Sequence, residues 1–427
     1  MVQAPAAAAH AAAGGQRAPQ PWLGAAAALF AVGWGANQFS SLLLAYRHQS
    51  HLSATTADAL FGVYAVGLIP ALLIGGRLSD RHGRRLVVPV VGLSAVATSI
   101  LMLGGVTGLG ALYAGRFLAG IASGLAFAPG TAWVKELSSP PWGAVGDAQL
   151  GARRAAVALT AGFGAGPLVA GLLAQWLPDP TVVPYIAHLM VVAAVCPWVL
   201  RTPETVGRHT TAAVGPTVGH RRRPLSPRHG IDRRFWLAAA PMAPWVFAAA
   251  SVAFAVLPAQ VTSHTGHYEV LFAAVVAGLT LLVGVLVQPW ARRLDARSEA
   301  RGVQVGLALV TIGMAVGAGA ASTAQPALVL VAAMLLGAGY GTCLVSGLLE
   351  VQRASHPEAL ARVTAVFYAL TYVGFAAPVV ISSLAPLADT TALLLGATVA
   401  CTVTLAGVAA GRRLPGAPMR AGRTTSR

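Results

Sequence analysis

Charged residues are scarce in this chain of 427 residues: Asp, Glu, Lys and Arg together make up 10%, against 56% hydrophobic residues. A water-soluble surface needs more charge than this, so a soluble protein is excluded. The hydrophobic residues instead form runs of about 20, the length that a helix needs to cross the roughly 30 Å hydrocarbon layer of a bilayer. The sequence therefore predicts an all-α membrane protein.

The sequence also lacks the groupings that catalysis or metal binding requires. Its cysteines, Cys196, Cys343 and Cys401, have no pairing spacing and are interpreted as apolar packing residues. It has no His-Glu-x-x-His pattern, no converging acids and no Gly-x-x-x-x-Gly-Lys loop for ATP phosphates. We therefore expect no metal, no cofactor and no enzyme or ATP-driven pump; a polytopic enzyme or receptor is the disfavoured alternative.

The hydrophobic runs predict twelve membrane-spanning helices. They lie at residues 22–46, 55–76, 86–106, 109–135, 155–177, 181–200, 236–258, 269–290, 302–322, 326–350, 360–385 and 389–411. A stretch rich in proline and arginine, 201–234, separates a six-helix bundle at 22–200 from another at 235–411. Residues 1–21 and 412–427 are predicted to be tails, and an even number of spans places both on one side.

The basic residues give the predicted topology an orientation. The formal net charge is +16, and lysine is nearly absent. The arginines fall in alternate loops, while the intervening loops hold essentially only Arg47, which is the positive-inside pattern of cytoplasmic loops. We therefore expect cytoplasmic termini and a lipid bilayer, not nucleic acid, as the surroundings. Many arginines with abundant Ala and Gly suggest a GC-rich bacterial gene, and hence a bacterial cell (plasma) membrane.

The two halves share features that indicate an internal repeat. In each half an arginine-rich loop follows the second span, and the fourth span ends in a glutamate, Glu136 or Glu350. Duplicated bundles that flank a site at the middle of the membrane are a recurrent transporter plan. The halves are therefore expected to be two similar bundles around a central site.

The loop after the second span reads Gly76-Arg77-Leu78-Ser79-Asp80-Arg81-His82-Gly83-Arg84-Arg85. It resembles the signature loop of the major facilitator superfamily of twelve-helix transporters. A generic positive-inside turn would explain the arginines, but not an acid and two glycines at these spacings. The resemblance implies that the loop latches the two halves in the outward-open state and releases them when the cavity opens inward. The residues concerned are Gly76, Asp80, Arg81, Gly83, Arg84 and Arg85.

The two glutamates are expected to belong to this cytoplasmic gate. Glu136 is predicted to pair with Arg84 or Arg81. Glu350 is predicted to pair with Arg292 or Arg293, although the second loop lacks the glycine and the early aspartate. The alternative is that each glutamate lies in solvent at a helix end.

Three residues are candidates for proton coupling. Arg116 lies inside the fourth span, where a charge is costly, and the family resemblance implies a role in coupling. Asp58, near the outer end of the second span, is its predicted acidic partner; a purely structural buried pair is the alternative. His188, in the sixth span, has a side chain whose unperturbed pKa near 6.5 suits a proton carrier. A packed, hydrogen-bonded histidine is the competing interpretation.

The fifth span contains Gly162-Phe163-Gly164-Ala165-Gly166-Pro167-Leu168-Val169-Ala170-Gly171. This segment resembles the motif of the drug:proton antiporter branch, except that Ala170 stands where the usual pattern has glycine. Pro167 can bend the helix, while Gly162, Gly166 and Gly171 let a neighbour lie against it. Pro203-Glu204-Thr205, after the sixth span, also resembles the superfamily.

In that family the first, fourth, seventh and tenth spans mainly line the cavity, and polar or aromatic faces of three spans here suggest its walls. The first and seventh spans offer Trp34, Asn37, Gln38, Ser41, Phe247, Ser251 and Phe254, and the eleventh offers Tyr368, Tyr372 and Phe375. Such a lining favours a bulky, mostly apolar substrate. The alternative for each aromatic residue is packing between helices.

These features predict a secondary transporter that works as a monomer by alternating access. It is expected to export a hydrophobic drug-like or secondary-metabolite molecule in exchange for protons. The alternative is an uptake facilitator or symporter for a small nutrient such as a sugar or an amino acid.

Overall fold

The computed structural model describes residues 20–143, 150–206, 232–298, 301–355 and 360–411. In these ranges twelve helical segments are long and apolar enough to cross a membrane, which confirms the predicted spans. The tails and most of the linker predicted at 201–234 lie outside the described residues. The first half contains α1 (Trp22–Gln49), α2 (Ala54–His82), the short η1 (Arg84–Leu86), α3 (Val87–Thr107), α4 (Leu109–Leu137), α5 (Leu150–Trp176) and α6 (Val183–Arg201).

The second half has more interruptions. Its seventh span is built from η2 (Phe235–Ala239), α7 (Ala240–Ser251), η3 (Val252–Val256) and η4 (Leu257–Gln260). The eighth combines α8 (Thr262–Thr265), η5 (Gly266–Tyr268), α9 (Glu269–Leu286) and α10 (Gln288–Arg297). The rest are α11 (Arg301–Thr323), α12 (Pro326–Arg353), α13 (Leu360–Val373) with η6 (Gly374–Ala376) and α14 (Ala377–Leu384), and α15 (Thr390–Gly411).

Interruptions of the seventh span coincide with prolines. Pro244 lies inside α7, and Pro258 lies in the terminal η4 segment. A proline removes a backbone donor and displaces the preceding turn, so π and 3₁₀ turns replace regular α-helix around it. The predicted span at 236–258 is therefore present, but as a deformed helix at the interface between the halves.

Small residues bring the second and fourth spans of the first half into contact. A Cβ atom at Gly120 of α4 would collide with the carbonyl oxygen of Tyr64 on α2, and one at Gly67 with that of Phe117. Close approach of this kind drives helix association where lipid offers no hydrophobic contrast.

The same arrangement recurs in the second half. Glycines at 337 and 341 of α12 lie against the backbone of Thr280 and Gly284 on α9. In both halves, then, the fourth span packs on the second through glycine, as the predicted internal repeat requires.

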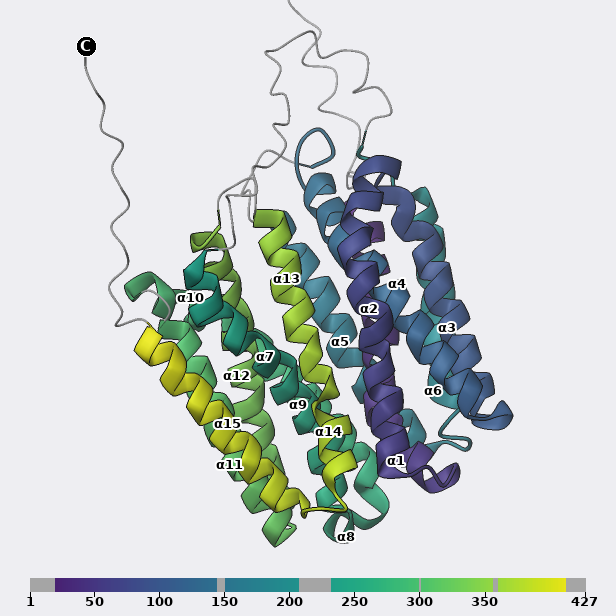
Figure 1. Ribbon diagram of the computed structural model, residues 1–427. Coiled ribbons are helices and arrows are strands. Elements are labelled where there is room, and N and C mark those ends of the chain that lie inside the picture. The colour runs from purple at the N-terminus through teal and green to yellow at the C-terminus, as the bar shows by residue number, and fades with distance from the viewer. Residues whose placement is uncertain (1–19, 144–149, 207–231, 299–300, 356–359, 412–427) are drawn as a thin grey trace, which may run out of the picture.

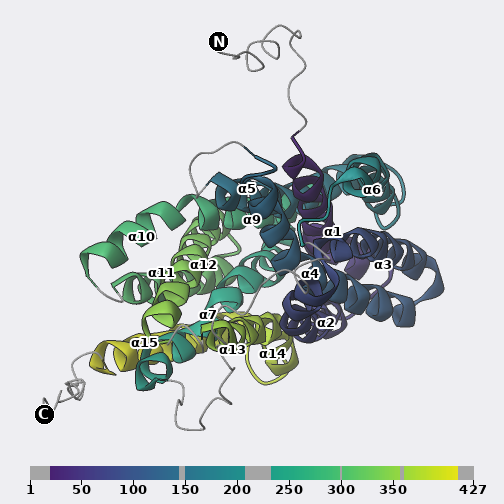
Figure 2. The same cartoon turned by 90° about the horizontal axis from the view of Figure 1, so that it is seen from above.

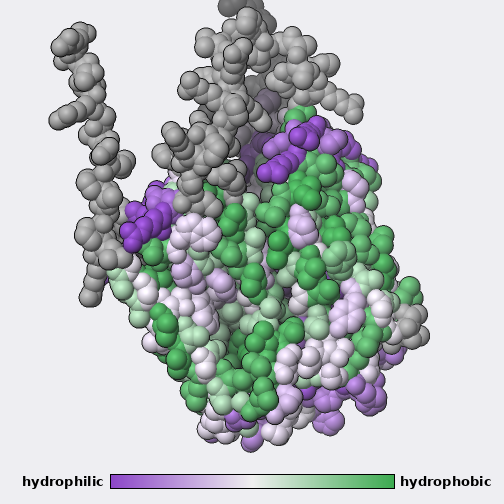
Figure 3. Space-filling model, in the orientation of Figure 1, coloured by the Kyte–Doolittle hydropathy of each residue, from purple (hydrophilic) through white to green (hydrophobic). Residues whose placement is uncertain are grey.

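Two bundles stand side by side, the first half in purple and blue and the second in green and yellow (Figure 1). From above, α5 lies beside α9, and α2 lies beside α13 and α14 (Figure 2). We call the end that carries Arg84 the arginine-rich end and the other the opposite end. Hydrophilic residues gather at both ends, most strongly at the arginine-rich end, while the middle of the face in view is mostly apolar (Figure 3).

The halves meet at the opposite end. His48 Nε2 lies 3.0 Å from Glu269 Oε1, and the Gln175 amide donates to the His267 carbonyl oxygen at 2.6 Å. At the arginine-rich end, by contrast, a cavity of about 650 Å³ separates α2 from α13. The halves are therefore joined by polar contacts at the opposite end, beside an open depression of about 720 Å³ between α1, α5 and α9, and are separated by the cavity at the arginine-rich end.

Candidate functional site

The signature loop makes a sharp turn at the arginine-rich end. Helix α2 ends at His82, and Gly83 has φ +97°, a conformation that side chains other than glycine rarely adopt. A Cβ atom at Gly83 would also collide with the carboxylate of Glu204. Glycine is therefore required here both by backbone conformation and by space.

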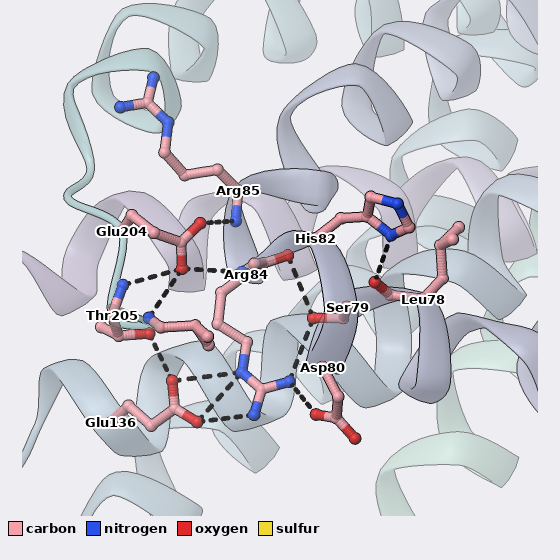
Figure 4. Close-up of polar contacts among 11 residues, drawn as sticks. Leu78, Ser79, Asp80, His82, Arg84, Arg85, Glu136, Glu204 and Thr205 are labelled. Atoms are coloured by element: carbon pink, nitrogen blue, oxygen red, sulfur yellow. Dashed lines mark hydrogen bonds and ion pairs between the residues drawn. The ribbon is translucent and has the colours of Figure 1, made fainter. Parts of the chain in front are cut away.

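Arg84 is the centre of the loop's polar contacts (Figure 4). Its guanidinium contacts Asp80 Oδ1 at 2.7 Å and Glu136 Oε1 at 2.9 Å, and it donates to Ser79 Oγ at 3.1 Å. The Thr205 hydroxyl donates to the other oxygen of Glu136. Of the two predicted partners of Glu136, the structure selects Arg84, and the network joins α2, α4 and the segment after α6.

Glu204 caps the turn from the far side. Its oxygens accept backbone N–H bonds from Arg84 at 2.8 Å and from Arg85, Thr205 and Val206 at 2.9 Å each. Burial opposes ionisation, but these four donors outweigh it and hold the pKa of the Glu204 carboxyl below its ordinary value. The Pro203-Glu204-Thr205 segment therefore belongs to the polar network of the loop, a contact that sequence reasoning did not assign to it.

Replacing Glu204 with glutamine is expected to lower the melting temperature by about 2–5 °C at neutral pH, because the amide group turns a donor toward backbone donors. Because the pKa of the Glu204 carboxyl is lower in the folded state, its ionised form stabilises the fold. This stabilisation is complete when the pH is above the ordinary pKa of 4.5, and it is lost as the pH falls through the lower pKa of the folded state. The difference between wild type and Glu204→Gln should therefore shrink as pH falls below 4.5 in thermal unfolding of purified protein. A difference independent of pH would contradict this account.

The second glutamate has other partners than predicted. Glu350 Oε2 accepts from Arg234 Nε at 2.9 Å, and Glu350 Oε1 contacts Arg353 at 2.6 Å. The predicted pairing with Arg292 or Arg293 is wrong, because α10 continues as a helix past both positions and Arg353 lies only one turn from Glu350 on α12. The second half thus holds its glutamate by a different pair of arginines.

Two loop residues stand apart from this network. Gly76 lines the cavity between α2 and α13, and a Cβ atom there would meet nothing within 4 Å, so no other helix lies against Gly76. Arg81 is exposed at the end of α2. Arg85 donates to the Leu200 carbonyl oxygen at 2.9 Å and so ties the loop to α6.

A cavity of about 40 Å³ lies at the centre of the interface between the halves. Its lining, in the part of the chain that the structure describes, contains no charged side chain: Asn37, Tyr64, Phe127, Phe163, Phe247, Ala250, Phe254, Leu281, Tyr340, Tyr372 and Phe375. The ring of Phe247 is stacked 4.6 Å from that of Tyr372 and 4.8 Å from that of Phe375. A drug-sized ligand needs about 300 Å³ or more, so these rings must separate to admit one.

Five of the predicted wall residues line this cavity, namely Asn37, Phe247, Phe254, Tyr372 and Phe375. Sequence reasoning missed the aromatic residues Tyr64, Phe127, Phe163 and Tyr340. The signal available was their aromatic character inside otherwise small-residue spans.

Other predicted wall residues point elsewhere. Gln38 is buried and donates to Thr98 Oγ1 at 3.5 Å, and the Ser41 hydroxyl donates to the Gln38 carbonyl oxygen. The Ser251 hydroxyl donates to the Gly374 carbonyl oxygen at 3.2 Å. The two hydroxyl groups and the Gln38 N–H thus donate to other protein groups, as polar groups inside the hydrocarbon layer must, while the Gln38 side-chain oxygen is buried without a hydrogen-bond partner in the described structure.

Two aromatic residues from the predicted walls also lie outside the central cavity. Trp34 is buried edge-on to Phe30, at a ring separation of 5.8 Å. Tyr368 lines the larger cavity between α2 and α13, while Tyr372, one turn further on, lines the central one. The two tyrosines thus connect the two cavities along one face of α13.

Arg116 is buried behind the cavity wall, with 1% of its surface exposed. It donates to the carbonyl oxygens of Leu60 at 3.2 Å and of Ala36 and Phe61 at 3.4 Å. The predicted pair with Asp58 is wrong: the described Asp58 side chain lies against Ser382 of α14, and carbonyl groups and rings surround Arg116 instead.

His188 is fully buried between α1, α3 and α6. Its Nε2 lies 2.9 Å from the Ala31 carbonyl oxygen and its Nδ1 2.8 Å from Thr98 Oγ1. Since a carbonyl oxygen can only accept, Nε2 carries the proton and Nδ1 accepts from threonine. His188 thus has two hydrogen bonds inside the first half and does not line the central cavity.

The glycines of the fifth span serve two contacts. A Cβ atom at Gly162 would collide with the Phe30 carbonyl oxygen, and one at Gly166 would lie 2.6 Å from that of Trp34, so α5 lies directly on α1. Gly171 instead lies against Ala274 of α9, across the interface between the halves. Pro167 is buried within α5.

The structure has two similar six-helix bundles with a central cavity between them and an ion-paired loop at one end. This arrangement is typical of membrane transporters. The family model of the Major Facilitator Superfamily matches residues 23–379. The chain therefore belongs to the Major Facilitator Superfamily, and it is a multi-pass membrane transporter, not an enzyme.

Solved structures agree with this fold. A mutant of the nucleoside transporter NupG shares 13% identity at a TM-score of 0.72, covering 92% of this chain and 99% of its own. A POT family transporter in complex with a thioalcohol-conjugated peptide shares 14% identity at 0.71, covering 92% and 95%. A mutant of the peptide transporter POT shares 14% identity at 0.73, covering 94% and 97%. No curated protein sequence matches the chain.

Proposed function

We propose that this transporter exports a bulky, mostly apolar small molecule from a bacterial cell in exchange for protons. The observation that carries the proposal is the central cavity, whose described lining is mainly aromatic and contains no charged side chain. A strongly anionic or phosphorylated solute would need fixed cations in the wall. Asn37 is the one amide side chain among the lining residues.

The arrangement of the two ends supports export as the direction. If the arginine-rich end is cytoplasmic, as the positive-inside rule indicates, the larger cavity between α2 and α13 opens toward the cytoplasm. A substrate would load there, pass Tyr368 and Tyr372, and leave when the opposite end parts. Both termini would then be cytoplasmic, and one monomer would contain the complete pathway.

Asp58 is the proposed proton carrier. It is buried on α2 against Ser382 of α14, so the two halves must part around it when the opposite end opens. A carboxyl group that is buried when the opposite end is closed and accessible when it is open can exchange protons with the outside only in the open state. Arg116 and His188, held within the first half, are proposed to maintain the geometry of α2 and α6 during this cycle.

Transport into everted membrane vesicles across a panel of lipophilic compounds tests this function. For the wild type we expect accumulation of the compound that depends on an imposed proton gradient. In Asp58→Asn this gradient-driven accumulation should fall at least about tenfold. Asp179→Asn, which changes an exposed carboxylate between α5 and α6, serves as the matched control and should keep the coupling. Gradient-independent flux would exclude antiport, and accumulation of labelled sugar or amino acid by whole cells would favour uptake.

A further inference from the structure

Arg116 carries a charge that no acid in the described structure neutralises. Its three backbone acceptors are all 3.2 Å or more away, and its guanidinium lies 4.6 Å from the Phe39 ring centre and 4.8 Å from that of Tyr64. Carbonyl dipoles and ring faces stabilise a guanidinium but remove none of its net charge. Because arginine is not deprotonated in proteins, a full positive charge persists at this depth.

This charge lies one ring behind the wall of the central cavity. Tyr64 contacts Arg116 and also lines the cavity. Phe61, 5.9 Å from the guanidinium, lies 5.6 Å from Phe254 and 5.3 Å from Phe375, both of which line the cavity. At Tyr64 a single aromatic ring therefore separates the guanidinium from any molecule bound in the cavity.

The cavity offers nothing to balance this field. None of its described lining residues is acidic, and Asp58, which is not among them, lies against Ser382 of α14. The electron-rich faces of Tyr64 and Phe61 are turned in part toward Arg116, which reduces what they can offer to a cationic ligand. The stacked rings of Phe247 and Tyr372 remain available for a planar apolar group.

We propose that Arg116 sets the charge preference of the site, so that planar aromatic molecules that are neutral or carry a negative charge bind, and lipophilic cations are rejected. This rests on the proposed function, because it assumes that the central cavity binds an apolar substrate. At an effective dielectric of about 20, a unit charge one ring away changes the affinity for a monovalent ligand by roughly tenfold or more, with opposite sign for anions and cations.

Three pyrene probes that share a scaffold test the proposal: 1-pyrenebutanol, 1-pyrenebutanoic acid and 4-(1-pyrenyl)butyltrimethylammonium. Their affinities are measured by tryptophan-to-pyrene energy transfer on protein in zwitterionic-lipid nanodiscs, after subtraction of partitioning into empty nanodiscs. For the wild type we expect the anion to bind at least about tenfold more tightly than the cation.

Variants separate the charge of Arg116 from its shape. Arg116→Gln should bring the anion and cation affinities within about threefold of each other, whereas Arg116→Lys should keep the preference for the anion. Arg154→Gln is the matched control, because it also removes an arginine that stacks on an aromatic ring, that of Trp22 at 4.2 Å from the ring centre. This variant should leave the ratio of anion to cation affinity unchanged. Asn37→Asp keeps Arg116 intact but adds a negative charge to the wall, and should shift the preference toward the cation even if Arg116→Gln does not fold.

Equal binding of anion and cation to the wild type, an unchanged ratio in folded Arg116→Gln, or no shift in Asn37→Asp would overturn the proposal. So would absence of binding by all three probes. These ratios are measured without a gradient and without transport. A failure of proton-driven export therefore leaves them untouched, and the two claims can be judged separately.

Discussion

Replacing Gly162 with valine is expected to abolish folding, seen as loss of the monodisperse peak in size-exclusion chromatography and of a cooperative thermal transition. The added Cβ atom would collide with the Phe30 carbonyl oxygen, which belongs to the backbone of α1 and cannot rotate away. Gly33 on α1 likewise leaves only 3.1 Å between its Cβ position and the Leu159 carbonyl oxygen. Overpacking costs about 1–3 kcal/mol in adaptable cores, and more is expected between two rigid helices.

Gly164→Val is the matched control for this substitution. Gly164 belongs to the same glycine-rich segment of α5, but its Cβ position meets nothing within 4 Å. Valine and glycine differ little in helix propensity compared with the cost of a backbone collision, so this variant should fold within about 0.5 kcal/mol of the wild type. Equal losses at the two positions would mean that propensity, and not the contact with α1, makes glycine necessary.

The spans could be predicted because hydropathy and length are local properties of a membrane helix. The runs at 22–46 and 109–135, for example, correspond to α1 and α4 of the structure. A helix in lipid must satisfy its own backbone, which leaves few alternatives to a continuous apolar segment. The loop at Gly83 was also predictable, because its glycine and its acid and arginines are close in sequence.

The partners of charged residues were harder to predict. The general need of a buried charge for a counterion predicts a pair of Asp58 with Arg116, yet the structure surrounds the guanidinium with carbonyl oxygens and rings. Glu350 was assigned to arginines in the equivalent loop, but a neighbour on its own helix and Arg234 were nearer. Such choices depend on helix rotation and on which segments approach each other, and neither is encoded in spacing along one span.

The walls of the cavity show the same limit. The helical face that contains Asn37 also contains Gln38, one residue on, and only the rotation of α1 against α3 decides that Gln38 turns toward Thr98. Ser251 similarly turns toward the η6 backbone while Phe254, in the next turn, faces the cavity. The spacing of residues along a helix identifies a face only to within about 100°. This range is wider than the change in direction that separates a residue lining the cavity from a neighbour that points elsewhere.

Replacing Asp80 with asparagine is expected to slow turnover about tenfold while leaving substrate affinity within about twofold and the melting temperature unchanged. The Asp80 side chain is 68% exposed, so its ion pair with Arg84 adds little stability. It lines the cavity that faces the first turns of α13, from Thr364 onward. When the arginine-rich end closes, a carboxylate there would approach the positive end of α13, a gain of about 1 kcal/mol made only in the closing step.

Asp232→Asn is the control for this prediction, because it removes another exposed carboxylate near the arginine-rich end. Asp232 accepts from the Arg234 backbone amide and does not line the cavity. Substrate-dependent turnover in proteoliposomes gives the rate, and equilibrium binding to the same preparation gives the affinity. A gate residue should change the first and not the second, since the closed arginine-rich end is populated only during the cycle. Parallel losses of rate and affinity would instead place Asp80 in the binding pathway, and an unchanged rate would remove it from the gate.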